Sequence, residues 1–255
     1  MTAASGRAPL VVHEAGDPAA PSVVLLHGLT DAGTVWPDLV ERWGSRYRIL
    51  APDLRGHGRS PRFTDEELVD PHAVMVADVV ALLDSLPGPV LLVGHSMGGN
   101  LALNATLARP ERVRALVLED PAKPPANATP DPEFVAWNEA MIDAVVADRA
   151  AEVARMARET PWSAAEIEAW AECKPFVDRR FLRRTVLGAA DWEELFEALT
   201  RPTLLLVPVE APMAPGPIAN PLVTRLVVEE AGHCLRRDRP EEYHRAVEAF
   251  WAEVL

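Results

Sequence analysis

A serine lies in a glycine-rich turn between a predicted strand and a predicted helix. Residues 94–99 read Gly-His-Ser-Met-Gly-Gly, directly after the apolar run 90–93 and before a helical pattern that starts near Gly98. A Gly-x-Ser-x-Gly string in this context turns a strand sharply into a helix and leaves the serine hydroxyl exposed. Side chains at positions 94 and 98 would collide with the neighbouring strand and helix. We therefore predict that Ser96 is a catalytic nucleophile.

A serine hydroxyl becomes a good nucleophile only when a base removes its proton. His233 follows the late apolar run 226–228 and precedes the final helix, so it is placed where such a base is needed. His13 and His244 lie on elements that would not reach Ser96. The other four histidines belong to other motifs or to a helix start: His27, His57, His72 and His95. We predict that His233 is the general base.

Short apolar runs alternate with helical patterns along most of the chain. Such alternation predicts an α/β fold, and runs without polar alternation are typical of strands covered on both faces in a parallel sheet. We predict a doubly wound, mostly parallel sheet of about eight strands. The runs that we interpret as strands are 10–12, 23–26, 48–51, 90–93, 115–118, 203–207 and 226–228.

Residues 121–199 interrupt this alternation with amphipathic helices that carry many of the chain's aromatic residues. We interpret them as a helical cap, inserted after the sixth strand, over the edge of the sheet where such folds bind ligands. The predicted organisation is a core of residues 1–120 and 200–255 with this cap between its two parts. About half of the cap's rings should fill its own core. The residues that we expect at the substrate are Trp137, Met141 and Trp162.

Two further motifs strengthen the interpretation of the serine turn. His27 and Gly28 follow the run 23–26, and residues 52–60 read Pro-Asp-Leu-Arg-Gly-His-Gly-Arg-Ser. With the turn at Ser96, their order resembles small capped serine hydrolases of the α/β-hydrolase superfamily, of the esterase and lactonase kind. The resemblance covers nearly the whole chain except the cap.

The resemblance implies an oxyanion hole made by the backbone N–H groups of Leu29 and Met97. Fixed donors of this kind stabilise the negative charge of a tetrahedral intermediate, and each contributes roughly 10² to 10³ in rate. We interpret residues 52–60 as a structural turn that packs beside the site.

A third residue, an acid that orients the histidine, completes the catalytic triad of that family. This chain departs from the family's common pattern at that acid. The loop after residues 203–207 contains Glu210 but no aspartate. Asp120 ends the strand beside that of Ser96, and a minority of the superfamily carries its acid there. The loop that contains Glu210 and the loop that starts at Asp120 both leave the carboxyl edge of the sheet on the side of His233. We favour Asp120, with Glu210 as the alternative and Glu119 or no acid as weaker ones; Asp120 would otherwise only cap the start of the insertion.

Composition limits the classes of partner. The net charge of −13 disfavours nucleic acid and anionic membranes. Cys173 and Cys234 are expected to be free thiols, and no secretory signal or apolar run long enough for a membrane span is visible. We expect a cytoplasmic monomer or homodimer that needs no cofactor or metal and takes a small-molecule substrate.

The leading functional hypothesis is hydrolysis of an ester or lactone through an acyl-enzyme, with an apolar or aromatic substrate favoured. The same triad would also serve a carbon–carbon bond hydrolase or a cofactor-free perhydrolase. Dehalogenation and epoxide opening are disfavoured because both typically need an aspartate where Ser96 stands. A non-catalytic small-molecule receptor on this fold is the alternative of another class. A dinucleotide-binding domain is disfavoured because no Gly-x-Gly-x-x-Gly turn follows the first strands.

Overall fold

The computed structural model describes residues 8–124, 130–184, 187–188 and 191–255. Residues 1–7, where we expected no secretory signal, lie outside this part of the chain. The described residues contain one seven-stranded sheet with the order β1-β3-β2-β4-β5-β6-β7. Its strands are β1 (Val12–Ala15), β2 (Ser22–Leu26), β3 (Arg48–Pro52), β4 (Val90–His95), β5 (Val113–Glu119), β6 (Thr203–Pro208) and β7 (Val223–Val228).

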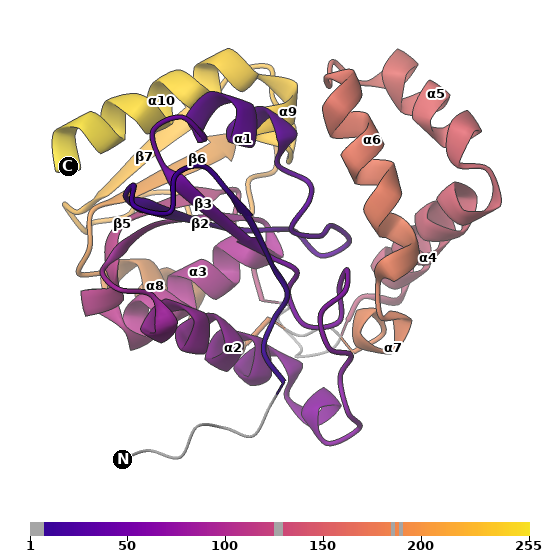
Figure 1. The fold of residues 1–255 in the computed structure, drawn as a ribbon, viewed down its shortest axis with the longest axis horizontal. Coiled ribbons are helices and arrows are strands. Elements are labelled where there is room, and N and C mark those ends of the chain that lie inside the picture. Colours follow the sequence, from indigo (N-terminus) through magenta and orange to yellow (C-terminus); the bar gives the residue numbers. More distant parts are fainter. Residues whose placement is uncertain (1–7, 125–129, 185–186, 189–190) are drawn as a thin grey trace.

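The sheet is parallel except for β1, which pairs antiparallel with β3. Helices cover both of its faces (Figure 1). Alternate residues of the central strands point to opposite sides: Leu92 packs with the helices of one face and Leu91 with those of the other. The predicted doubly wound, mostly parallel α/β fold is therefore confirmed.

The helices divide between the two faces and the cap. Helices α2 (Pro71–Ser85), α3 (Met97–Ala108) and α8 (Trp192–Glu197) contribute to the core of one face, and α1 (Pro37–Trp43) and α10 (Pro240–Val254) to that of the other. The cap consists of α4 (Pro132–Ala147), α5 (Arg149–Glu159), α6 (Ala164–Cys173) and α7 (Arg179–Leu182), with the short 3-10 helix η3 (Lys174–Phe176). The remaining short helices are α9 (Leu235–Asp238), η1 (Glu67–Val69) and η2 (Pro110–Arg112).

Two details of the predicted sheet need correction. The described residues contain seven strands rather than about eight, so the cap follows the fifth strand, β5, and not the sixth. The sequence itself offers only seven apolar runs, and residues 8–11 form no strand. The first strand lies at Val12–Ala15 instead of residues 10–12, because its bounds are set by antiparallel pairing with β3 and not by the apolar run.

The cap in space is smaller than the predicted segment 121–199. Helices α4 to α7 (residues 132–182) stand apart from the sheet, whereas α8 lies against α3 (Figure 1). Trp192 and Phe196 of α8 are accordingly buried in the main core. A small core inside the cap contains Trp170, so the aromatic rings of the insertion divide between the two cores and the pocket described below.

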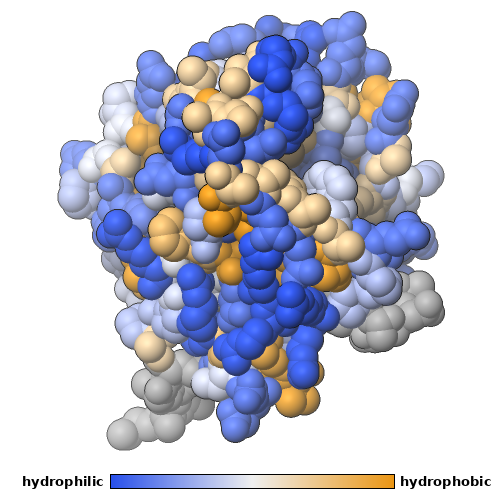
Figure 2. Space-filling view, turned by 90° about the vertical axis from the view of Figure 1, so that its right-hand side faces the viewer, coloured by the Kyte–Doolittle hydropathy of each residue, from blue (hydrophilic) through white to orange (hydrophobic). Residues whose placement is uncertain are grey.

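The outer face of the cap carries many hydrophilic side chains with hydrophobic ones among them (Figure 2). An exposed ion pair on the cap joins Arg149 of α5 to Glu168 of α6. None of the helices in the described ranges is both long and apolar enough to cross a membrane.

Candidate active site

Ser96 occupies a strained turn between β4 and α3. Its backbone lies at φ 52° and ψ −118°, a region that residues with a side chain rarely adopt and that is found at functional sites. A Cβ atom at Gly98 would lie 2.1 Å from the carbonyl oxygen of Leu26, and one at Gly94 would lie 2.4 Å from that of Gly98. Both glycines are therefore required for the turn, because a side chain at either position would collide with neighbouring backbone, as the sequence predicted.

His233 and Asp120 meet although 113 residues separate them in the chain. Nδ1 of His233 donates to Oδ2 of Asp120 at 2.7 Å. The other carboxylate oxygen of Asp120 accepts from the backbone N–H of Met213 at 3.0 Å, which fixes the orientation of the group. Asp120 is buried and has a φ of 36°, so this side chain is held by its backbone as well as by its partners.

Glu210, the alternative acid, is exposed on the loop after β6. The ring nitrogen of His233 that a triad acid would orient is already bonded to Asp120. Ser96 and His233 both line one pocket, and His233 is bonded to Asp120, so the three predicted residues are brought to the same place.

The turn predicted to form the oxyanion hole is braced by two buried histidines. Nδ1 of His27 donates to the carbonyl of Gly28 at 2.8 Å, and Nε2 of His57 donates to the carbonyl of Leu29. Burial lowers the pKa of His27 to about 3, so its ring is neutral at neutral pH. None of residues 52–60 lines the pocket, as expected for a supporting turn.

The two predicted oxyanion donors differ in their position relative to the pocket. Leu29 lines the pocket, and Met97 is the first residue of α3. The N–H groups of a helix's first turn have no acceptor within the helix and are directed toward its N-terminal end. Met97 is fully buried and does not line the pocket, so of the two predicted donors only Leu29 lies at the pocket surface.

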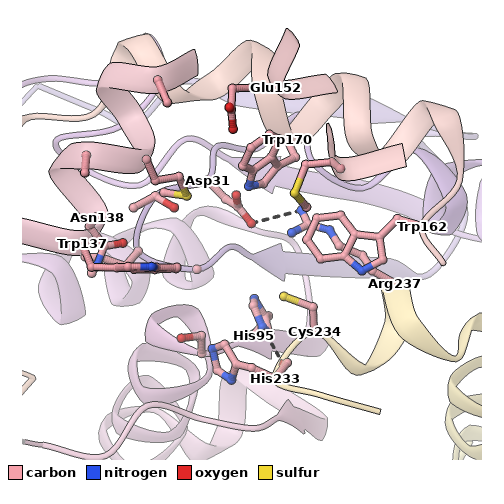
Figure 3. A pocket seen from close by; sticks show the side chains of 18 of the residues that line it. Asp31, His95, Trp137, Asn138, Glu152, Trp162, Trp170, His233, Cys234 and Arg237 are labelled. Atoms are coloured by element: carbon pink, nitrogen blue, oxygen red, sulfur yellow. Dashed lines mark hydrogen bonds and ion pairs between the residues drawn. The ribbon is translucent and has the colours of Figure 1, made fainter. Parts of the chain in front are cut away.

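His95, beside the nucleophile, contacts the predicted base. Its Nε2 donates to the backbone carbonyl of His233 at 3.1 Å, and the two rings lie 4.8 Å apart (Figure 3). Burial lowers the pKa of His95 well below its usual value, so the ring is neutral and holds the loop of His233 without adding charge. The sequence placed His95 in the serine motif but gave it no role.

The pocket lies between the cap and the sheet edge and has a volume of about 660 Å³. In Figure 3 the cap side chains lie above His95, His233 and Cys234. Its apolar lining includes all three cap residues predicted to meet substrate, together with others of the cap: Phe134, Trp137, Met141, Met156, Trp162 and Trp170.

The pocket tryptophans differ in how firmly they are held. Trp162 donates its Nε1–H to Asp238 at 2.7 Å and covers the guanidinium of Arg237 at 4.8 Å. Trp137 is 63% exposed at the mouth of the pocket. The two rings lie on opposite sides of the pocket (Figure 3), so a hydrogen-bonded ring lies across from a mostly exposed one.

The sequence analysis missed the charged residues of the pocket, among them Asp31 and Arg237. Asp31 lies three residues after Gly28 and Arg237 four after His233, so proximity to those motifs was the available signal. Cys234 also lines the pocket, but burial raises its pKa to about 12, which leaves it a thiol at neutral pH. Both cysteines are free, as expected. Within the described ranges, no group of three or more His, Cys, Asp or Glu side chains is placed to hold a metal ion.

Comparison with known proteins decides the family. A model of the alpha/beta hydrolase family matches residues 23–252. The chain belongs to this family. The match runs from β2 through the turns at Gly28 and Ser96 to His233 and the last helix, and so includes every segment of the site described above.

Individual relatives in this family have different activities. Lipase LipV of Mycobacterium tuberculosis is 45% identical over 107 residues, which are 41% of this chain and 39% of the lipase. Epoxide hydrolase A of the same organism is 38% identical over 128 residues, 49% of this chain and 39% of that enzyme. The chain thus matches about two fifths of each relative's length. The crystal structure of E-2-(acetamidomethylene)succinate hydrolase superimposes with a TM-score of 0.73 at 26% identity, over 95% of both chains.

Glu119, next to the predicted acid, is expected to make the stability of this protein depend on pH. Burial raises the pKa of Glu119 to about 7, against the lowering effect of Arg236, Arg237 and His233. The unfolded chain releases this proton near the ordinary value of 4.5, so stability is lost as the pH rises from there through about 7. Glu119→Gln cannot lose a proton and should escape this loss.

Denaturant unfolding over a pH series measures this effect. The free energy of unfolding of Glu119→Gln relative to wild type should rise by a few kcal/mol between about pH 5 and about pH 8. Glu168→Gln, an exposed change on α6, should show no such trend. A difference between Glu119→Gln and wild type that stays constant with pH would contradict the assignment.

Proposed function

We propose that this chain is a serine hydrolase that cleaves a carboxylic ester or lactone through an acyl-enzyme. The observation that carries the proposal is the 2.7 Å hydrogen bond between His233 and Asp120 in the pocket that Ser96 also lines. A nucleophile, a base and a carboxylate that orients the base are the arrangement that acyl transfer requires.

In the proposed reaction, Nε2 of His233 takes the hydroxyl proton of Ser96 as its oxygen attacks the carbonyl carbon. The N–H groups of Leu29 and Met97 stabilise the oxyanion of the intermediate. The intermediate collapses as the protonated His233 gives its proton to the leaving alkoxide; with a lactone, this alcohol stays attached to the acyl group. Water, activated by the same histidine, then attacks the acyl-enzyme and releases the acid and Ser96. Asp120 keeps Nδ1 of His233 protonated throughout.

The choice of an ester over an epoxide rests on the residue at position 96. Epoxide opening typically uses a carboxylate nucleophile, and this chain has a serine there. The matches to Epoxide hydrolase A and to LipV, a lipase, each extend over 39% of the relative, and the identity to LipV is higher, at 45% against 38%. These facts favour acyl transfer.

The pocket supports an apolar or aromatic group of modest size in the substrate. Most of the cap side chains above Ser96 are apolar, and three of them are tryptophans. Indole rings offer large flat contact areas to a planar or hydrocarbon group. The volume of about 660 Å³ accommodates a small molecule rather than a polymer.

Two measurements test the proposal. A fluorophosphonate probe should label the wild-type protein, and digestion with mass spectrometry should place the label on Ser96. Esters and lactones of graded acyl size should then be hydrolysed with a preference for apolar acyl groups. Failure of the folded protein to react with the probe would count against any serine enzyme and favour a receptor on this fold.

Trp137 offers a test of the pocket that spares the fold. Because its ring is mostly exposed, Trp137→Ala should leave the melting temperature nearly unchanged, while kcat/KM for an aryl ester falls about 10-fold through lost apolar contact. Hydrolysis of an acetyl ester should change much less. Val146→Ala, an exposed change on the same helix outside the pocket, is the control. Equal effects on both esters would place Trp137 outside the substrate site.

A further inference from the structure

Six buried charged side chains form a continuous hydrogen-bonded network between the cap and the sheet. Each is at most 5% exposed. Three are basic and three are acidic; five of them pair as ions, as buried charges must, whereas burial raises the pKa of Glu119 to about 7 and leaves it only partly ionised at neutral pH. Two members belong to the cap and four to the core: Glu166 and Lys174, and Asp31, Glu119, Arg236 and Arg237.

One end of the network holds the oxyanion turn. Nζ of Lys174, in the cap, donates to the carbonyl of Thr30 at 2.9 Å and to Oδ1 of Asp31 at 2.7 Å. These residues directly follow Leu29, whose N–H is the proposed oxyanion donor. Oδ2 of Asp31 accepts from Arg237 at 3.1 Å, so the turn is tied to the segment after the base.

The centre of the network is a cap carboxylate that holds two arginines of the core. Oε1 of Glu166 accepts from Arg236 at 2.7 Å, and Oε2 accepts from Arg237 at 2.8 Å. The arginines follow His233 by three and four residues. Burial alone would raise the pKa of Glu166, but the two guanidinium groups hold it below its usual value. Glu166 is therefore ionised at neutral pH and binds the start of α9.

The other end of the network reaches the nucleophile and the acid. The backbone N–H of Arg236 donates to Oε1 of Glu119 at 2.9 Å. The backbone carbonyl of Glu119 accepts from the N–H of Ser96 at 3.0 Å, and the next residue is Asp120. The three loops that carry the proposed chemistry are thus linked to one another by Asp31 with Arg237 and by Glu119 with Arg236, and two side chains of the cap bind this linked set.

We propose that Glu166 and Lys174 are positioning residues. They hold the oxyanion turn, the base His233 and the nucleophile Ser96 in the relative positions that the reaction needs. The inference rests on the proposed function. Stability alone explains such a network poorly, since apolar residues of similar volume often stabilise a protein as much as a buried ion pair does. A network that fixes loop positions instead lowers the reorganisation needed at the moment of reaction.

Glu166→Gln tests the proposal with Glu168→Gln, two residues away on the exposed face of α6, as its control. Kinetics are measured on a p-nitrophenyl ester well below the melting temperature, where near-ultraviolet circular dichroism shows the variant folded. We expect kcat of Glu166→Gln to fall about 10- to 100-fold, because small displacements of reacting groups cost this much, while KM stays nearly constant. A purely structural role would lower the melting temperature and leave kcat of the folded protein unchanged.

Lys174→Met provides a second variant if Glu166→Gln does not fold. It removes the contacts to Thr30 and Asp31 but leaves Glu166 with both arginines. We expect kcat to fall about 10-fold, because only the oxyanion turn loses its contacts to the cap. If wild type is active and labelled by fluorophosphonate while kcat of the folded variants matches the control, the network proposal is overturned and the proposed function stands. A wild type that is neither active nor labelled overturns both.

Discussion

Ser96→Ala is expected to lower kcat/KM on a p-nitrophenyl ester by about 10⁵- to 10⁶-fold, because removing the nucleophile of a triad costs nearly all of its rate enhancement. The substitution deletes one oxygen atom, and the glycines on either side of the turn remain. The variant should therefore fold and keep its pocket. Labelling by fluorophosphonate should disappear with the activity.

Ser85→Ala is the matched control, because Ser85 is exposed at the end of α2, away from the pocket. It should retain wild-type kinetics and labelling. If Ser96→Ala kept more than about a hundredth of the wild-type rate, hydrolysis would have to proceed by direct attack of water, and the acyl-enzyme would be excluded.

The sequence predicted the turn at Ser96 well because its constraint is local. Only glycine fits at positions 94 and 98, and the strand and helix that enforce this lie directly beside them. The ranking of Asp120 above Glu210 used the strand that each residue ends and the resemblance to a minority of the superfamily. The structure places Asp120 as that ranking expects, since β5 pairs with β4 and Asp120 accepts a hydrogen bond from His233.

Features that depend on distant partners were not predictable in this way. β1 is defined by its pairing with β3, and α8 joins the main core although it lies in the inserted segment. The buried charges were missed for a similar reason. Charged side chains are usually exposed, and nothing in the local sequence of Glu166 or Lys174 shows that partners from other segments surround it.

Asp120→Asn is expected to lower kcat about 10³- to 10⁴-fold with little change in stability, while Glu210→Gln keeps nearly full activity. Asparagine is among the residues that best tolerate the φ of 36° at this position, and its amide oxygen can still accept from the N–H of Met213. With that bond kept, the amide nitrogen faces Nδ1 of His233. Two N–H groups cannot form a hydrogen bond with each other, so Nδ1 of His233 cannot keep its proton there.

The imidazole must then lose its proton at Nδ1 and carry it at Nε2, where it cannot accept the proton of Ser96. Catalysis fails through the tautomer of His233 even though each residue stays in place, so KM should change far less than kcat. The comparison separates the two acids sharply. Full activity in Asp120→Asn together with a loss of about 10³-fold in Glu210→Gln would show that the loop after β6 supplies the acid. Glu210 would then have to displace Asp120 from a bond of 2.7 Å, which requires that loop to move when substrate binds.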